Sequence, residues 1–201
     1  MATQSTKNRS ESKSSKSGDF QVPAAAGYIG AAVAGAAIAA AANVGRKMFV
    51  QGISARKGSW DESLAEEHKM VLGLFDKLLE TADDETKKRK MMLMQISHAL
   101  DKHAYAEEHV VYTSLREANF ASDAAKLEAE HGEIKTFIHR LGHLEASDPS
   151  WIEIVAEFRD TVAVHAAMEE QEIFPQLRAQ IDETLDKKIT NEVNAAGFMM
   201  A

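Results

Sequence analysis

Residues 103–112 read HAYAEEHVVY, and residues 165–175 read HAAMEEQEIFP. Each stretch places a glutamate four residues after a histidine, as His103 with Glu107 and His165 with Glu169. Residues four apart on an α-helix lie on one face, so each pair directs an imidazole and a carboxylate into the same space. A buried carboxylate is unfavourable unless it is paired or coordinated, and we therefore expect a metal cation beside both pairs.

Four amphipathic helices are predicted from apolar residues that recur at helical spacing. They cover residues 61–79, 85–116, 122–144 and 151–173. The apolar face of each predicted helix includes one histidine, in chain order His68, His103, His131 and His165. Pro175 is expected to end the fourth helix. Because the predicted connections are short, the sequence favours an all-α fold with an antiparallel, up-down four-helix bundle.

The composition restricts the chemistry of any site. The 201-residue chain contains no cysteine, which excludes thiolate ligands, iron–sulfur clusters and disulfides. Its net charge of −8 is uneven, because residues 1–57 carry eight Lys/Arg and two Asp/Glu, whereas the remainder carries fifteen and twenty-nine. We expect no nucleic-acid partner for such an acidic body.

Four segments are expected along the chain. Residues 1–22 form a polar, disordered arm, 23–57 an Ala/Gly-rich helical segment with a basic linker, 58–178 the bundle, and 179–201 a short C-terminal helix and tail. The uncharged run from Ala24 to Ala42 has two interpretations, a soluble or partner-packed helix and a weak membrane segment. The chain is expected to be cytoplasmic, with membrane association if that segment inserts.

Imidazoles and carboxylates without thiolate suit iron, with manganese and zinc as alternatives, and the two glutamates are placed to bridge two ions. Coordination positions would then remain open for dioxygen, peroxide or nitric oxide. A ferritin-like site would require a second Glu-x-x-His pair, and only Glu128 with His131 has that spacing.

At these residues the sequence resembles the hemerythrin-like (HHE cation-binding) domain family, over residues 60–178. The resemblance is carried by His68, HAYAEEHVVY, EHGEI around His131, and HAAMEEQEIFP. It implies two non-haem iron ions joined by an oxo or hydroxo bridge. The metal ligands that it implies are His68, His103, Glu107, His131, His165 and Glu169. Glu170 is the reserve for Glu169, because the last carboxylate of oxygen-carrying hemerythrins follows its histidine by five residues.

One departure from the family concerns function. Oxygen-carrying hemerythrins have a second histidine one turn after the third-helix ligand, and Lys135 takes that place here. Reversible oxygen carriage is then less favoured than peroxide or NO chemistry, iron handling or redox sensing, unless His139 or water restores the coordination. Lys135 is also a candidate ion-pair partner for one of the two buried glutamates.

Two other classes of function stay open. One is a structural or adaptor bundle whose metal only stabilises the fold, and the other is a mononuclear metal hydrolase. Whether the chain turns over a substrate does not follow from the sequence. The other histidines are expected at the surface or behind the ligands. These histidines are His98, His109, His139 and His143. For Tyr105 and Tyr112, aromatic packing is the commoner role, while redox activity or a hydrogen bond to a bound oxygen species stays open.

Overall fold

The computed structural model describes residues 58–200, together with Met1. The predicted polar arm and the Ala/Gly-rich segment lie outside these residues. Within 58–200, no helix combines the length and the apolar character that crossing a membrane requires.

All regular elements from Trp60 to Met199 are helical, which confirms the all-α class. In chain order they are α2 (Trp60–Leu79), α3 (Thr86–Ala106), η1 (Glu107–Val111), α4 (Tyr112–Glu117), α5 (Ala121–His143), α6 (Pro149–Met168), η2 (Glu169–Ile173), α7 (Phe174–Gln180) and α8 (Glu183–Met199). The elements η1 and η2 are π-helical turns. Each continues an α-helix into the next, so α3 to α4 and α6 to α7 are two long helical runs.

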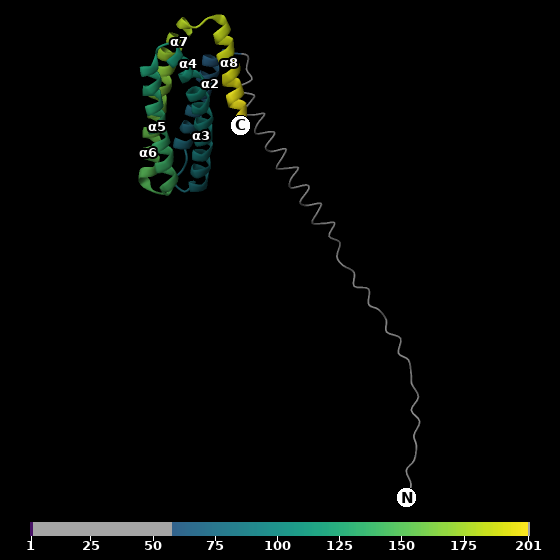
Figure 1. Cartoon of the computed structure of the whole chain (residues 1–201). Coiled ribbons are helices and arrows are strands. Elements are labelled where there is room, and N and C mark those ends of the chain that lie inside the picture. The colour runs from purple at the N-terminus through teal and green to yellow at the C-terminus, as the bar shows by residue number, and fades with distance from the viewer. Residues whose placement is uncertain (2–57, 201) are drawn as a thin grey trace. The chain divides into compact units, whose positions relative to one another are not determined.

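The four long helices lie side by side (Figure 1), with α2 against α3 and α6, and α5 against α6 and α3. The helix α8 lies along the outside of this bundle and contacts α2, α3 and η1. Capping residues fix where the helices begin. Glu62 accepts a hydrogen bond from the Ser59 N–H at the start of α2, Asp148 accepts one from Ser150 N–H at α6, and Asp182 accepts one from Leu185 N–H at α8.

The core consists of two apolar clusters. One cluster joins the start of α2 to η1, α4, α7 and α8, and includes Trp60 and Leu64. The other joins the end of α2 to α3, α5 and α6, and includes Val71 and Phe75. His68 follows Leu64 by one turn and precedes Val71 by one, and so lies on α2 between the two clusters. The apolar faces therefore position a polar layer inside the bundle.

Pro175 does not end the fourth helix, and this prediction is wrong. The chain stays helical through η2 and α7, with the proline in the first turn of α7. A proline is accommodated there because its missing N–H is not required by the first turn of a helix. The helix instead ends at Gln180, and Asp182 caps the start of α8, the helix in the predicted C-terminal segment.

Candidate metal centre

The six residues predicted as metal ligands lie together in the polar layer between the two apolar clusters. All are at least 95% buried, and Glu107 and Glu169 are fully buried. Their side chains form two groups of possible metal-binding residues, within each of which the ligand atoms lie no more than 4.8 Å apart. The first group is His68, His103, Glu107 and Glu169, and the second is Glu107, His131, His165 and Glu169. Both glutamates belong to both groups.

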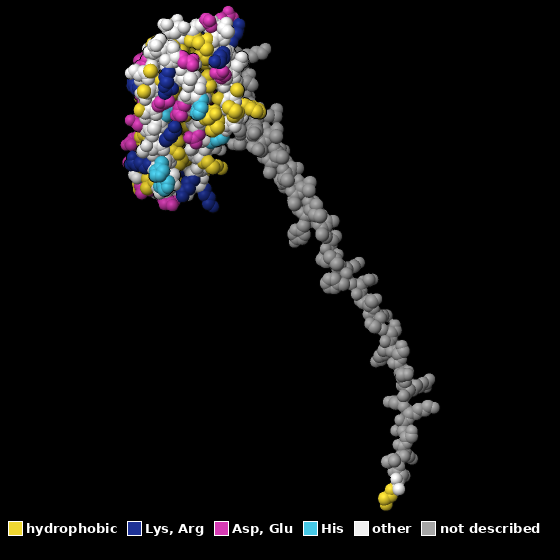
Figure 2. Space-filling view, in the orientation of Figure 1, with side chains coloured by type: hydrophobic (Ala, Val, Ile, Leu, Met, Phe, Trp, Pro, Cys, Tyr) yellow, Lys and Arg dark blue, Asp and Glu magenta, His cyan; other side chains and the backbone are white. Residues whose placement is uncertain are grey.

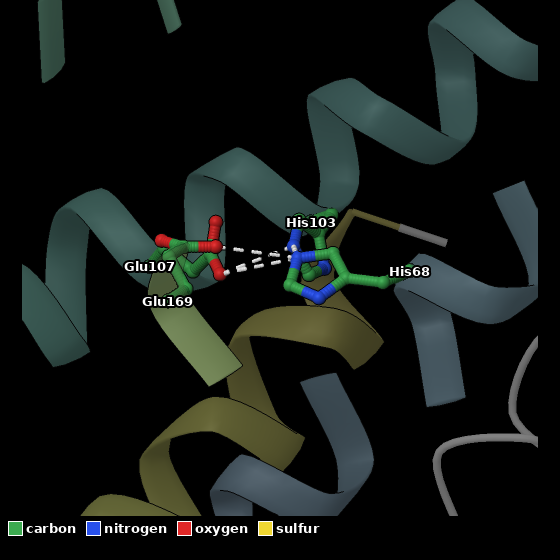
Figure 3. A group of neighbouring side chains, drawn as sticks. All are labelled: His68, His103, Glu107 and Glu169. Carbon is green, nitrogen blue, oxygen red and sulfur yellow. Dashed lines mark hydrogen bonds and ion pairs between the residues drawn. The ribbon is translucent and has the colours of Figure 1, made fainter. Parts of the chain in front are cut away.

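In the first group, imidazoles from α2 and α3 face carboxylates from η1 and η2 (Figure 3). The Nε2 atoms of His68 and His103 lie 2.8 Å apart. His103 Nε2 is 3.1 Å from Glu107 Oε1, and His68 Nε2 is 3.3 Å from Glu169 Oε2. Nitrogen and oxygen donors from four different elements thus converge on one small volume.

The second group repeats this arrangement with histidines from α5 and α6. The Nε2 atoms of His131 and His165 lie 3.1 Å apart. His131 Nε2 is 3.4 Å from Glu107 Oε2, and His165 Nε2 is 3.4 Å from Glu169 Oε2. The Glu107 carboxylate therefore directs one oxygen toward each pair of histidines, as a carboxylate that bridges two cations would.

Three of the four oxygens of the two buried carboxylates lack the hydrogen bonds that such groups normally have. Glu107 Oε1, Glu107 Oε2 and Glu169 Oε2 accept no hydrogen bond from the residues that the structure describes. Buried polar atoms are almost always satisfied, and carboxylates most of all. The donor set of imidazoles and carboxylates matches iron, manganese or zinc, so the residues present fit a pair of bound cations.

The electrostatics of the site favour positive charge. Burial alone would lower the pKa of His103, but the carboxylates of Glu107 and Glu67 outweigh burial and raise this pKa. Conversely, burial alone would raise the pKa of Glu107, yet His103 and His131 hold it well below its usual range. A site whose ionised carboxylates favour positively charged histidines would attract metal cations for the same reason.

Each candidate histidine is held from behind by a second carboxylate. His68 Nδ1 lies 2.8 Å from Glu170, and His103 Nδ1 lies 3.0 Å from Glu67. Likewise His131 Nδ1 lies 2.9 Å from Glu108, and His165 Nδ1 lies 2.9 Å from Glu130. We refer to these four glutamates as the outer carboxylates. Because an ionised carboxylate can only accept, each Nδ1–H donates, and the Nε2 atom on the other side of each ring faces into the site.

The π-helical turns separate the adjacent glutamates of the two EE pairs. η1 begins at Glu107 and η2 at Glu169, and in each turn a backbone N–H bonds to the carbonyl five residues earlier. Glu107 and Glu169 point inward. Glu108 and Glu170 instead cross to histidines of the opposite pair, on α5 and α2. We call the six clustered candidate ligands the inner donors, because their nitrogen and oxygen atoms could hold a metal. The structure therefore places Glu169 among the inner donors and Glu170, the reserve ligand, outside them.

Tyr112, whose role the sequence left open, is fully buried beside the second group. Its hydroxyl donates a 2.6 Å hydrogen bond to Glu169 Oε1 and lies 3.2 Å from His131 Nε2. Burial and the charges of the two glutamates raise the pKa of Tyr112, so the phenol stays protonated and remains a donor. Tyr105 stacks on His109 instead.

Other residues considered from the sequence lie away from the inner donors. Lys135 pairs with Glu108 at 3.0 Å rather than with either inner glutamate. Glu128 pairs with Arg116, so the ferritin-like use of Glu128 finds no support. His139 is exposed and packs against His143, and so does not replace the missing histidine. The missed residues are Glu67 and Glu130, whose only signal is that each directly precedes a candidate histidine.

A small cavity of about 20 Å³ adjoins the histidines. It is lined by His68, Leu100, Asp101, His103, Ala104, His131, Ile134, Lys135, Ile138, Val162 and His165. Such a volume accommodates about one water-sized molecule. All four candidate histidines are thus reachable by a small ligand.

A helical bundle whose inner layer holds two sets of histidines around shared glutamates defines a class of cation-binding helical proteins. Similarity to known sequences identifies the family within that class. The model of the Hemerythrin HHE cation binding domain family matches residues 61–177, and the chain belongs to this family. The family resemblance noted in the sequence is thereby confirmed.

The chain is also similar to a protein of Nostoc sp. (strain PCC 7120 / SAG 25.82 / UTEX 2576) named DNA nickase. The two are 26% identical over 160 residues, which is 80% of this chain and 45% of that protein. The chain therefore spans less than half the length of this relative.

Proposed function

We propose that this protein binds a pair of iron ions and through them binds or reacts with small oxygen or nitrogen species, namely O2, H2O2 or NO. A sensor of iron or oxygen would use the same site. The observation that carries the proposal is the pair of buried glutamates shared between two pairs of histidines, with three carboxylate oxygens that accept no hydrogen bond from the described residues. The antiparallel up-down order of the bundle forms part of the proposal, because it brings all four histidines to one level.

In this proposal His68 and His103 hold one ion, His131 and His165 hold the other, and Glu107 and Glu169 are shared. When bound, the ions would supply redox chemistry and open positions for a small ligand. The protein's own residues orient the imidazoles through the outer carboxylates, donate a hydrogen bond from Tyr112 to Glu169, and surround the site with apolar side chains that exclude bulk water.

The test is metal analysis of the purified, iron-reconstituted protein by mass spectrometry. We expect about two irons per chain, and Glu107→Gln is expected to leave one or none, because an amide is a weaker ligand that does not bridge. Glu117→Gln is the matched control, since Glu117 is exposed on the same helical run and should keep both irons. A wild-type protein that retains no iron would exclude the proposal, and one metal per chain would favour the mononuclear alternative.

DNA cleavage is a second candidate, suggested by the name of the Nostoc relative. The charge distribution argues against it, because phosphate binding depends on clustered Lys and Arg. Acidic and basic side chains are instead interspersed on the face of the bundle visible in Figure 2. Incubation of supercoiled plasmid with the iron-loaded protein tests this candidate directly. Nicking that disappears in Glu107→Gln would favour DNA cleavage over the binding of small oxygen or nitrogen species.

A further inference from the structure

We propose that small uncharged molecules reach the metal centre through a gap between α3 and α5, and that the charges at the mouth of this gap, from Asp101 and Lys135, disfavour anions. The inference rests on the proposed function. It adds to that function a route and a charge class for the ligand.

The exposure of the cavity lining locates the mouth. The walls at Leu100, Ile134 and Val162 are buried. Asp101 on α3 and Lys135 on α5 also line the cavity, and both are exposed. One turn further along the same two helices, Ala104 and Ile138 line the cavity and are half-buried. The gap between these two helical turns is therefore where the cavity opens to solvent.

The interior of the gap suits a small neutral molecule. Beyond the mouth, the route passes apolar side chains before it reaches the histidine rings. An ion that enters loses hydration along this path, whereas O2, NO or H2O2 loses much less. The volume of about 20 Å³ also excludes larger substrates unless side chains move.

The fixed charges at the mouth are negative in sum. Lys135 is held by Glu108 at 3.0 Å, so the charge of this lysine is already balanced. Asp101 adds a further negative charge on the opposite side of the gap. An approaching anion thus meets two carboxylates and one ammonium group and gains no net attraction.

The charge of the whole centre leads to the same conclusion. The two inner glutamates and the four outer carboxylates carry six negative charges. Lys102, which pairs with Glu67, and Lys135, which pairs with Glu108, contribute two positive charges, so four negative charges remain. Two divalent cations would balance the remaining four. Lys126 lies 4.0 Å from Glu130 and is 62% exposed, so it adds little to this balance. In the iron(II) form, a neutral centre behind an acidic mouth therefore offers an anion no electrostatic advantage, and in the oxidised form only the mouth charges would disfavour it.

The first experiment tests the route. The iron(II)-loaded protein is mixed with NO in a stopped-flow spectrophotometer, and the rate of the absorbance change is compared between Ile138→Trp and Thr136→Trp. Thr136 is exposed on α5 and does not line the cavity, so it controls for the added bulk. We expect Ile138→Trp to slow NO binding by about tenfold or more, because a packed indole leaves no path without a rearrangement, and Thr136→Trp to leave it unchanged. Ala104→Leu narrows the opposite side and serves if Ile138→Trp does not fold.

The second experiment tests the charge class, with azide as the anionic probe of the oxidised protein. Asp101→Asn should raise the azide association rate about two- to fivefold at low ionic strength and leave the NO rate unchanged. Glu133→Gln is the matched control, because this exposed carboxylate lies on another side of α5 and does not line the cavity. Equal responses of Asp101→Asn and Glu133→Gln would overturn the role of the mouth charges, and equal NO rates in Ile138→Trp and Thr136→Trp would overturn the route.

The iron content separates these failures from a failure of the proposed function. Wild-type protein that holds two irons and binds NO at a rate unaffected by Ile138→Trp and Ala104→Leu would refute the route alone. Wild-type protein that holds no iron would refute the proposed function and, with it, this inference.

Discussion

Tyr112 and Phe174 occupy matching places in the two halves of the site. Each follows the histidine of its HxxxE motif by nine residues, as Tyr112 follows His103 and Phe174 follows His165. Tyr112 lies against His131, and Phe174 is stacked with His68 at 6.5 Å between ring centroids. Only the tyrosine has a hydroxyl, so the two halves differ in one hydrogen bond, the bond from Tyr112 to Glu169.

Replacement of Tyr112 by Phe is expected to destabilise the metal-free protein by roughly 1–3 kcal/mol, because it leaves Glu169 Oε1 buried without its donor. The free energy of unfolding from urea titration measures the loss. Tyr105→Phe is the control, since Tyr105 stacks on His109 away from the inner glutamates. Equal stability of Tyr112→Phe and wild type would show that the hydrogen bond is not formed in solution.

The outer carboxylates lead to a second prediction at the scale of single residues, which concerns metal affinity. Glu170→Gln removes the charged acceptor of His68 Nδ1 and is expected to weaken metal binding about 10- to 100-fold. Glu172→Gln is the control, because Glu172 is exposed in the same π-helical turn. Competition with a chelator of known affinity gives both constants. If Glu170 were itself an inner ligand, its removal would instead lower the number of bound metals.

The sequence predicted the inward placement of the six candidate ligands better than the placement of the carboxylates behind them. His68, His131 and both HxxxE pairs stand on apolar helical faces, and periodicity places such residues in a core. Glu67 and Glu130 were missed because a carboxylate on the polar face of a predicted helix is expected to face solvent. Only the packing of two helices shows that Glu67 on α2 reaches His103 on α3.

At the scale of the helices, the bounds of α2, of α5 and of the run from α3 to α4 were predicted well. The end of the fourth helix and the π-helical turns were not predicted. Apolar spacing indicates the helices, and capping residues fix where α2 and α6 begin. A π-helical turn contains one residue more than an α-helical turn. The contacts that side chains of the turn make across the bundle stabilise this geometry. Glu108 contacts His131 and Glu170 contacts His68, contacts that no local pattern encodes.

The start of α2 is tied to α7 and α8 by Arg178. Its guanidinium donates to Asp61 at 2.6 Å and lies 3.7 Å from Asp186. Burial alone would raise the pKa of Asp61, but the hydrogen bonds from Ser59 and Arg178 and the charge of Arg178 hold this pKa below the usual 3.8. This carboxylate therefore stabilises the folded state at pH values above 3.8, and the contribution is lost as the pH falls through the lowered pKa.

Asp61→Asn should accordingly lower the stability at pH 7 and reduce the loss of stability between pH 4 and pH 2. Thermal unfolding of the metal-free protein across this range measures both effects. Glu66→Gln is the control, because Glu66 pairs only with its exposed neighbour Lys69 among the described residues. Parallel pH profiles for Asp61→Asn and wild type would contradict the assignment.

At the scale of the whole molecule, α8 completes one of the two apolar clusters. Ile189, Val193 and Ala196 are buried in the cluster that contains Trp60. Trp60 also donates its indole N–H to Asp186 and its backbone N–H to Thr190. The helix α8 is therefore part of the core at the end of the bundle where η1 begins at Glu107.

Truncation after Ile181 is expected to reduce stability by roughly 3–6 kcal/mol, because burial of an Ile or Val side chain contributes about 1.5–3 kcal/mol. Domains of this size are stable by only about 5–15 kcal/mol, so the metal-free truncated bundle should be close to unfolding at 25 °C. Bound metal would restore part of the stability, because it binds only the folded state. Circular dichroism melts with and without iron(II) measure both effects, with deletion of residues 2–22, the predicted polar arm, as the control. A truncated chain as stable as the control would mean that the four-helix bundle is complete without α8.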